Sequence, residues 1–188
     1  MAYDLKNVFY LGNTQEYTNA YAASEDSVQP IDVSAYVDPI SKGRSKGQGL
    51  AVYKVHSQIS TAGGELPINT ETANFMYGLS VKPFTTTGDR LTGQLVAGDT
   101  LVSSDLLVYG AQWSGGAAGA PGMVTSEVQE FLTPSTTVPY VVVRDTIFQI
   151  MQTSTVFNAD LHISFRMECA MITLDTATLN QLLRTQTA

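Results

Sequence analysis

The sequence predicts an all-β protein: an antiparallel β-sandwich or jelly roll of about eight strands with an irregular N-terminal arm and a short C-terminal helix. Residues 160–172 alternate between apolar and polar side chains, which is typical of a strand with one buried face. Short apolar or β-branched segments recur between residues 31 and 153 and are separated by turns that contain glycine or proline. No comparable helical period occurs in this middle region.

The alternating segment also predicts which side chains face the core. The positions expected to point inward are Leu161, Ile163, Phe165, Met167, Cys169 and Met171. A slip of one residue would bury Arg166 and Glu168, so the apolar pattern fixes the register of this strand. Because Cys169 lies on the apolar side, we expect a small core residue there rather than a reactive thiol.

The patterns divide the chain into an arm at residues 1–30, a sandwich at residues 31–172, and a helix with a tail at residues 173–188. The arm carries five aromatic residues among Asn, Gln, Thr and Ala and shows no lasting period of 2 or 3.6. It is either a frayed terminus or a segment that packs on a neighbouring molecule.

Within the sandwich, residues 50–60 and 124–132 differ in how clearly their sequence predicts a strand. Residues 50–60 are expected to form a long strand, with Ala51, Tyr53, Val55 and Ile59 on one face. Residues 124–132 are compatible with a strand or a short helix.

The C-terminal helix is predicted by its capping residues. Asp175 is suited to the N-cap position, and Leu174 and Leu179 stand where a hydrophobic staple is expected. Leu182 and Leu183 extend Leu179 into an apolar stripe at helical spacing. This stripe covers either the sheet of its own chain or a neighbouring subunit.

The charge composition argues against some classes of partner. Ten basic and 17 acidic residues give a net charge of −7, and only 14% of residues are charged. An acidic chain of this kind is not a general nucleic-acid binder. The only basic cluster, Lys42, Arg44 and Lys46, is either a weak phosphate contact or an ordinary solvated loop. No apolar segment approaches the ~20 residues of a membrane-spanning helix, and the N-terminus lacks a signal-peptide pattern.

The search for catalytic motifs predicts that the protein is not an enzyme. Residues 112–116, Gln-Trp-Ser-Gly-Gly, lack the first glycine of a nucleophile elbow. The two histidines, His56 and His162, and the single cysteine do not have the spacing of metal ligands. We therefore expect no cofactor and no metal. A pair of distant carboxylates, as in a glycosidase, stays open because such residues can meet in space.

The chain size, the β-rich middle and the aromatic residues of the arm give this sequence its general character. Loops rich in Thr, Ser, Gly and Ala, such as residues 85–87 and 115–122, add to it. In these features the chain resembles viral and bacteriophage capsid (coat) proteins of the single jelly-roll type. Many small coat proteins have basic N-terminal arms, whereas residues 1–30 of this chain contain only Lys6.

The resemblance implies a structural virion protein, most simply a capsid subunit that is made in the host cytoplasm and self-assembles into an icosahedral shell. Its partners would be copies of itself, other virion proteins and a membrane or scaffold surface, without strong nucleic-acid binding. The residues expected to make subunit contacts are Tyr3, Phe9, Tyr10, Tyr17, Tyr21, Leu179, Leu182 and Leu183. The alternative is a carbohydrate- or receptor-binding β-sandwich of a spike or adhesin.

Overall fold

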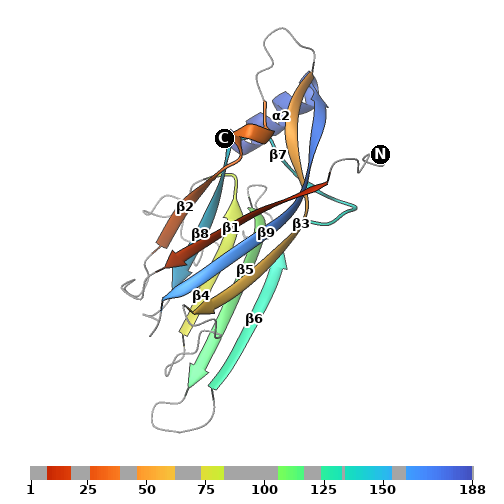
Figure 1. The fold of residues 1–188 in the computed structure, drawn as a ribbon. Helices are drawn as coiled ribbons and strands as arrows, with labels where there is room; N and C mark the ends of the chain where they lie inside the picture. The colour runs from red at the N-terminus through yellow and green to blue at the C-terminus, as the bar shows by residue number, and fades with distance from the viewer. Residues whose placement is uncertain are drawn as a thin grey trace.

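The computed structural model describes residues 8–17, 26–38, 46–61, 73–82, 106–116, 124–132, 134–153 and 160–187. These residues form two antiparallel sheets, a 3-10 turn at Ser34–Tyr36 and one C-terminal helix (Figure 1). The elements are β1 (Phe9–Tyr17), β2 (Asp26–Asp32), β3 (Lys46–Thr61), β4 (Ala73–Ser80), β5 (Leu106–Gly116), β6 (Val124–Leu132), β7 (Tyr140–Val142), β8 (Thr146–Thr153), β9 (Leu161–Asp175) and α2 (Thr176–Thr187). The predicted all-β class is confirmed.

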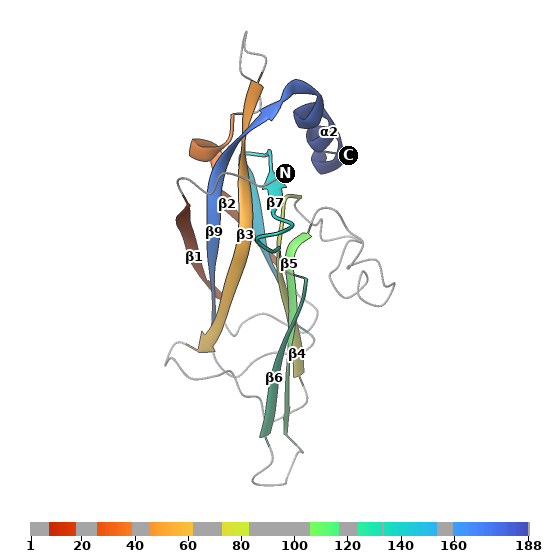
Figure 2. The same cartoon turned by 90° about the vertical axis from the view of Figure 1, so that its right-hand side faces the viewer.

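The strand pairing is that of a jelly roll. When a long antiparallel hairpin rolls up, its first strand pairs with its last, its second with the one before the last, and so on inward. The pairs found are β1 with β9, β2 with β8, β3 with β7, and β4 with β5. β6 is an additional strand that pairs with β5. The sheets are therefore ordered β1-β9-β3-β7 and β2-β8-β4-β5-β6, and they stack as two layers (Figure 2).

The core lies between these layers and is organised around β9. Leu161, Ile163, Phe165, Met167 and Cys169 are all buried, as their alternation predicts. They pack with residues of the facing sheet, among them Tyr77 and Leu79 of β4. The rings of Tyr77 and Phe165 lie 5.9 Å apart between centroids.

The prediction of an irregular arm at residues 1–30 is wrong for the part that the structure describes. β1 pairs with β9 over nine consecutive residues, and β2 is an integral strand of the other sheet. The sandwich thus begins at Phe9 rather than at residue 31. The inward positions of β1 include the polar residues Asn13 and Gln15, so the sequence of this strand does not alternate between apolar and polar side chains. Gln15 is nevertheless buried. Tyr3 and Tyr21 lie outside the described residues.

Met171 is the one member of the predicted inward set that is exposed, with 47% of its surface accessible. Beyond Cys169 the buried side of β9 changes. Ala170 and Leu174 are buried instead, on the face that carries α2. Figure 2 shows the upper ends of β3 and β9 extending beyond the facing sheet to meet this helix. The apolar alternation therefore continues beyond Cys169 on the same face of β9, although in this region α2 covers the other face.

A register shift in β3 explains a second difference. The pairing of β3 with β9 shifts between Val52 and Lys54. As a result Ala51 and Tyr53 pack with Ala170 on the outer side, whereas Val55 and Ile59 belong to the central core. The expected common face of Ala51, Tyr53, Val55 and Ile59 is thus divided by a β-bulge, which simple alternation does not reveal.

The C-terminal helix begins where its sequence predicts. The backbone N–H of Thr178 donates to Oδ1 of Asp175 at 2.8 Å, so Asp175 is the N-cap. Leu174 and Leu179 are buried in one cluster, on which Leu182 and Leu183 also pack. Of the two locations left open by the sequence, the stripe takes the sheet of its own chain. Residues 124–132, also left open, form strand β6.

Candidate functional site

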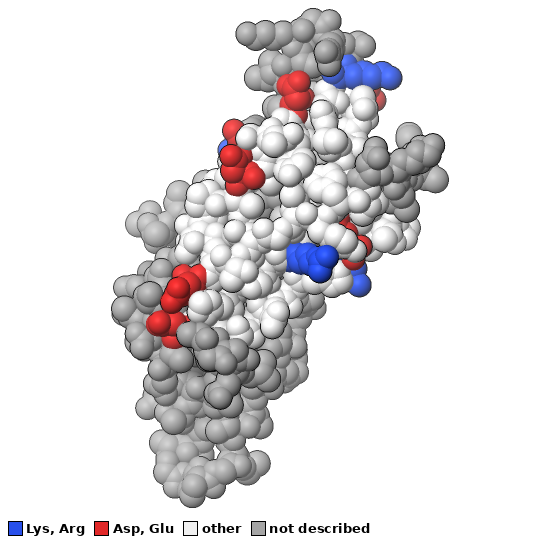
Figure 3. Space-filling model, viewed as in Figure 1, with Lys and Arg blue, Asp and Glu red and all other residues white. Residues whose placement is uncertain are grey.

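The outer face of the β1-β9-β3 sheet is polar because the alternate residues of each strand point away from the core. The neighbouring pairs across it are Tyr10 with Glu168, Gly12 with Arg166, Thr14 with Ser164, and Glu16 with His162. On the other side of β9, His56 pairs with Arg166 and Gln58 with Ser164. Most of this face is uncharged, with only a few charged side chains on it (Figure 3).

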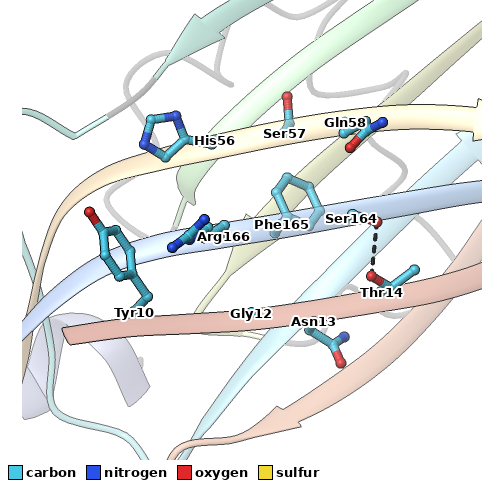
Figure 4. Close-up of a pocket in the computed structure, with 10 residues that line it drawn as sticks. All are labelled: Tyr10, Gly12, Asn13, Thr14, His56, Ser57, Gln58, Ser164, Phe165 and Arg166. Carbon is cyan, nitrogen blue, oxygen red and sulfur yellow. Dashed lines mark hydrogen bonds between the residues drawn. The ribbon is translucent and has the colours of Figure 1, made fainter.

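A cavity of about 500 Å³ opens on this face where Gly12 contributes no side chain. Its outward-facing lining residues are Tyr10, Thr14, His56, Gln58, Ser164 and Arg166, from three adjacent strands (Figure 4). A β-carbon at Gly12 would meet only the carbonyl oxygen of Phe165, at 3.6 Å. A side chain at position 12 would therefore extend into the open space of the cavity.

Two contacts fix the side chains around the cavity. The guanidinium of Arg166 lies 4.0 Å from the centroid of the Tyr10 ring, which is a cation–π contact. The hydroxyl oxygens of Thr14 and Ser164 are 2.8 Å apart. Such a surface offers donors, acceptors and one cation to a polar ligand or to a neighbouring protein.

The histidines differ in their surroundings. His56 is exposed, and its Nε2 lies 3.0 Å from Oε1 of Glu168. Its partner is thus a carboxylate and not a hydroxyl that it could activate as a nucleophile. His162 is half-buried, and its Nε2 makes no hydrogen bond within the described part of the chain.

The structure distributes the residues predicted for subunit contacts over different places. Phe9 packs inside its own chain, stacked on Tyr36 at a centroid distance of 5.0 Å. Tyr10 is 56% exposed and borders the cavity, and Tyr17 ends β1 opposite Leu161. Leu179 is 5% exposed, and Leu182 and Leu183 are half-buried; all three pack on the β1-β9-β3-β7 sheet of their own chain. Whether any of them also contacts another subunit stays a prediction.

The basic cluster is only partly visible. Lys42 and Arg44 lie outside the described residues, and Lys46 begins β3. Lys46 borders a second cavity of about 300 Å³, together with Asp38 and Met171. The phosphate contact at this cluster stays a prediction.

Sequence patterns do not indicate the cavity, because residues 9–17 lack the period of 2 that would predict a strand beside β9. The period of 2 in residues 160–172 places Arg166 outward, but only the pairing with β1 brings Gly12 and Tyr10 next to it. Among the described residues, no group of His, Cys, Asp or Glu is arranged to hold a metal ion. No helix in the described part of the chain is long and apolar enough to cross a membrane.

No family model matches the chain, and no curated protein matches it. Among solved structures, it is similar to VP1 of human polyomavirus 12 in complex with 3′-sialyllactosamine, with a TM-score of 0.44 and 8% identity over 90% of this chain and 100% of that chain. VP1 of New Jersey polyomavirus has a TM-score of 0.44 and 7% sequence identity, and the match covers 90% of this chain and 100% of that chain. A structure of turnip yellow mosaic virus has a TM-score of 0.33 and 10% sequence identity, and the match covers 91% of this chain and 99% of that chain.

Proposed function

We propose that this chain is a structural virion protein, a capsid subunit that assembles with copies of itself into an icosahedral shell. The observation that carries the proposal is the rolled-hairpin pairing of β1 with β9, β2 with β8, β3 with β7 and β4 with β5. This jelly-roll arrangement is a recurrent architecture of capsid subunits. The low content of charged residues, 14%, supports it, because surfaces covered by neighbouring subunits need little charge for solubility.

The shell would form without condensing nucleic acid on the N-terminal segments of its subunits. The chain has a net charge of −7, and residues 1–30 contain one lysine. Proteins that neutralise phosphates do so with clusters of Lys and Arg. We therefore propose assembly through protein–protein contacts, on a membrane or scaffold where a support is needed, in the host cytoplasm.

The test is the size of the purified full-length protein. Size-exclusion chromatography with light scattering, followed by electron microscopy, should show closed megadalton particles after nuclease treatment. The ratio of absorbance at 260 and 280 nm should be that of protein alone. A single monomeric or trimeric species at all concentrations and salt conditions would contradict the proposal.

A second function, binding of a carbohydrate, is favoured by the cavity. Hydroxyl and amide groups of Thr14, Ser164 and Gln58 surround it, and the Arg166 guanidinium stands beside the Tyr10 ring. Saturation-transfer NMR with a panel of neutral and acidic glycans would detect such binding. Arg166→Ala should abolish the signal if the cavity is responsible, and Asp145→Ala, an exposed change outside the cavity lining, should not.

A further inference from the structure

The four edges of the two sheets are protected to different degrees. Unpaired edge strands expose backbone N–H and C=O groups that can pair with another chain. The edge at β7 is capped within the chain: Gln186 donates from Nε2 to the carbonyl of Val141 at 2.7 Å and accepts from the N–H of Val143 at 3.1 Å. The side-chain amide of Gln186 thus takes the place of a neighbouring strand.

The edges of the other sheet carry residues that oppose pairing. β2 contains Pro30, which has no N–H to donate, and begins and ends with Asp26 and Asp32. β6 contains two acidic residues, Glu127 and Glu130. Both features are typical of strands that avoid edge-to-edge association.

β1 is the edge that lacks these features. It is nine residues long, pairs with β9 without a register shift, and contains no proline and a single charge, at Glu16. No described strand pairs with its outer side. Its backbone is therefore prepared for a further strand.

We infer that β1 pairs with β1 of a second copy of this chain, antiparallel and about a twofold axis at Asn13. This register places Tyr10 opposite Glu16 of the second copy and Gly12 opposite Thr14 of the second copy, on the outer face. It also pairs the backbone of Phe9, whose side chain is half-buried, with the backbone of Tyr17 of the second copy. The two four-stranded sheets would join into one continuous sheet of eight strands.

Charge complementarity supports this register. The Arg166 guanidinium lies over the Tyr10 ring, and the nearby carboxylate of Glu168 is bonded to His56. Glu16 is exposed, and its own cross-strand neighbour is His162. With the axis at Asn13, Glu16 of the second copy stands next to the Tyr10 ring, where the Arg166 guanidinium can receive it. Symmetry supplies this ion pair twice.

This contact deepens the proposed function and rests on it, because it names one interface by which copies of the subunit would associate. Its most direct test is a register-specific disulfide. The variant Gly12→Cys/Thr14→Cys places two thiols opposite each other across the twofold axis, twice per dimer. The Cα atoms of opposed residues are about 4.5–5.5 Å apart, within the about 4.4–6.8 Å that a disulfide spans. Oxidation with diamide should give a covalent dimer. Mass spectrometry should identify a disulfide between residue 12 of one chain and residue 14 of the other.

The controls use the same chemistry out of register. Gly12→Cys alone and Thr14→Cys alone should give no covalent dimer, because diagonal positions are about 7–8 Å apart. Gly12→Cys/Glu16→Cys tests a register displaced by two residues and should not cross-link. The native Cys169 does not interfere, because it is buried, which raises the pKa of its thiol to about 12. Absence of a 12–14 cross-link in folded protein, or equal cross-linking of the controls, would overturn the inference.

A charge exchange provides a second measurement that needs no oxidation. Glu16→Arg and Arg166→Glu should each weaken dimerisation roughly tenfold, and the double variant should restore it. Asp145→Arg, the same charge change at an exposed position outside β1, should leave the dimer unchanged. Large particles without the 12–14 cross-link would reject this contact and leave the shell function standing, whereas cross-linked dimers that never enlarge would reject the shell and leave the contact standing.

Discussion

The side chains of Asn13 and Gln149 join the two sheets through the core. Asn13 Nδ2 in β1 donates to Oε1 of Gln149 in β8 at 3.3 Å, and Nε2 of Gln149 donates to the carbonyl of Ile163 at 3.2 Å. Gln149 is fully buried. A buried amide of this kind is tolerated because its polar atoms are bonded, and it fixes β1 and β9 relative to the opposite sheet.

Gln149→Leu should destabilise the protein by about 1–3 kcal/mol, because it removes from the core the acceptor of the Asn13 side-chain amide and the additional bond to the carbonyl of Ile163. Urea unfolding monitored by tryptophan fluorescence measures the change. The matched control is Gln58→Leu on the exposed outer face, which should change stability by less than about 0.5 kcal/mol. Equal effects of the two substitutions would show that the bonds of Gln149 contribute nothing to stability.

Phe165→Ala should cost about 3–5 kcal/mol, because the ring is 1% exposed and its removal leaves a cavity next to Tyr77. Its neighbour Arg166 points outward, so Arg166→Ala should be within about 0.5 kcal/mol of the wild type in the monomer. Thermal or urea unfolding of both variants decides this prediction. A stable Phe165→Ala variant would contradict the register of β9.

The sequence could predict the strands whose periods are complete. Residues 161–169 alternate without interruption, and Asp175, Leu174 and Leu179 carry a local capping signal, so β9 and α2 followed from short-range patterns. β1 did not, because its inward Asn13 and Gln15 are polar, and the partner of Asn13, Gln149, stands 136 positions later in the chain. The same holds for the cavity, because its lining brings Gly12 beside Arg166, 154 positions later in the chain.

Gly47 is required where α2 crosses β3. A β-carbon there would lie 2.5 Å from Cδ2 of Leu179 and 3.2 Å from the carbonyl oxygen of Asp38. Gly47→Val should therefore displace α2 and cost about 1–3 kcal/mol, as overpacking does. Trypsin cleavage after Arg184 should accelerate. The matched control is Gly12→Val, where the added β-carbon has room. Unchanged cleavage of Gly47→Val would mean that α2 is not held at this position.

The start of α2 should respond to acid. Hydrogen bonds from the backbone and hydroxyl of Thr178 hold the pKa of Asp175 below its usual value of 3.8. A lowered folded-state pKa means that the carboxylate stabilises the fold above the unfolded pKa, and that this contribution is lost as pH falls through the folded pKa. NMR chemical shifts of the first helical turn should therefore change below about pH 4.

Asp175→Asn keeps an oxygen that accepts the Thr178 N–H but does not titrate, so this pH dependence should disappear. The control is Asp32→Asn, because the pKa of Asp32 is also lowered, by bonds from Ser34, at a site outside the helix. In that variant the helical shifts should titrate as in the wild type. The same acid response in Asp175→Asn would assign the effect to another group.

Deletion of residues 1–17 should prevent stable folding, because it removes β1 from the sheet. Phe9 and Leu11 pack on the core, and as half-buried side chains they contribute roughly 2–3 kcal/mol together. The deletion also leaves Gln149 without Asn13 and exposes the edge of β9 along its apolar segment. Against a typical total stability of about 5–15 kcal/mol, these losses together are large.

The matched control is deletion of residues 1–7, which leaves β1 whole. That variant should unfold at the wild-type temperature by circular dichroism, whereas the deletion of 1–17 should be insoluble or lack a cooperative transition. If the longer deletion melts like the wild type and fails only in assembly, β1 acts as a separable arm and not as a strand of the sandwich. Adding residues 8–17 as a synthetic peptide distinguishes the two cases. If β1 completes the sheet, the peptide should restore the cooperative transition of the truncated protein. If β1 is a separable arm, the peptide should not change the transition.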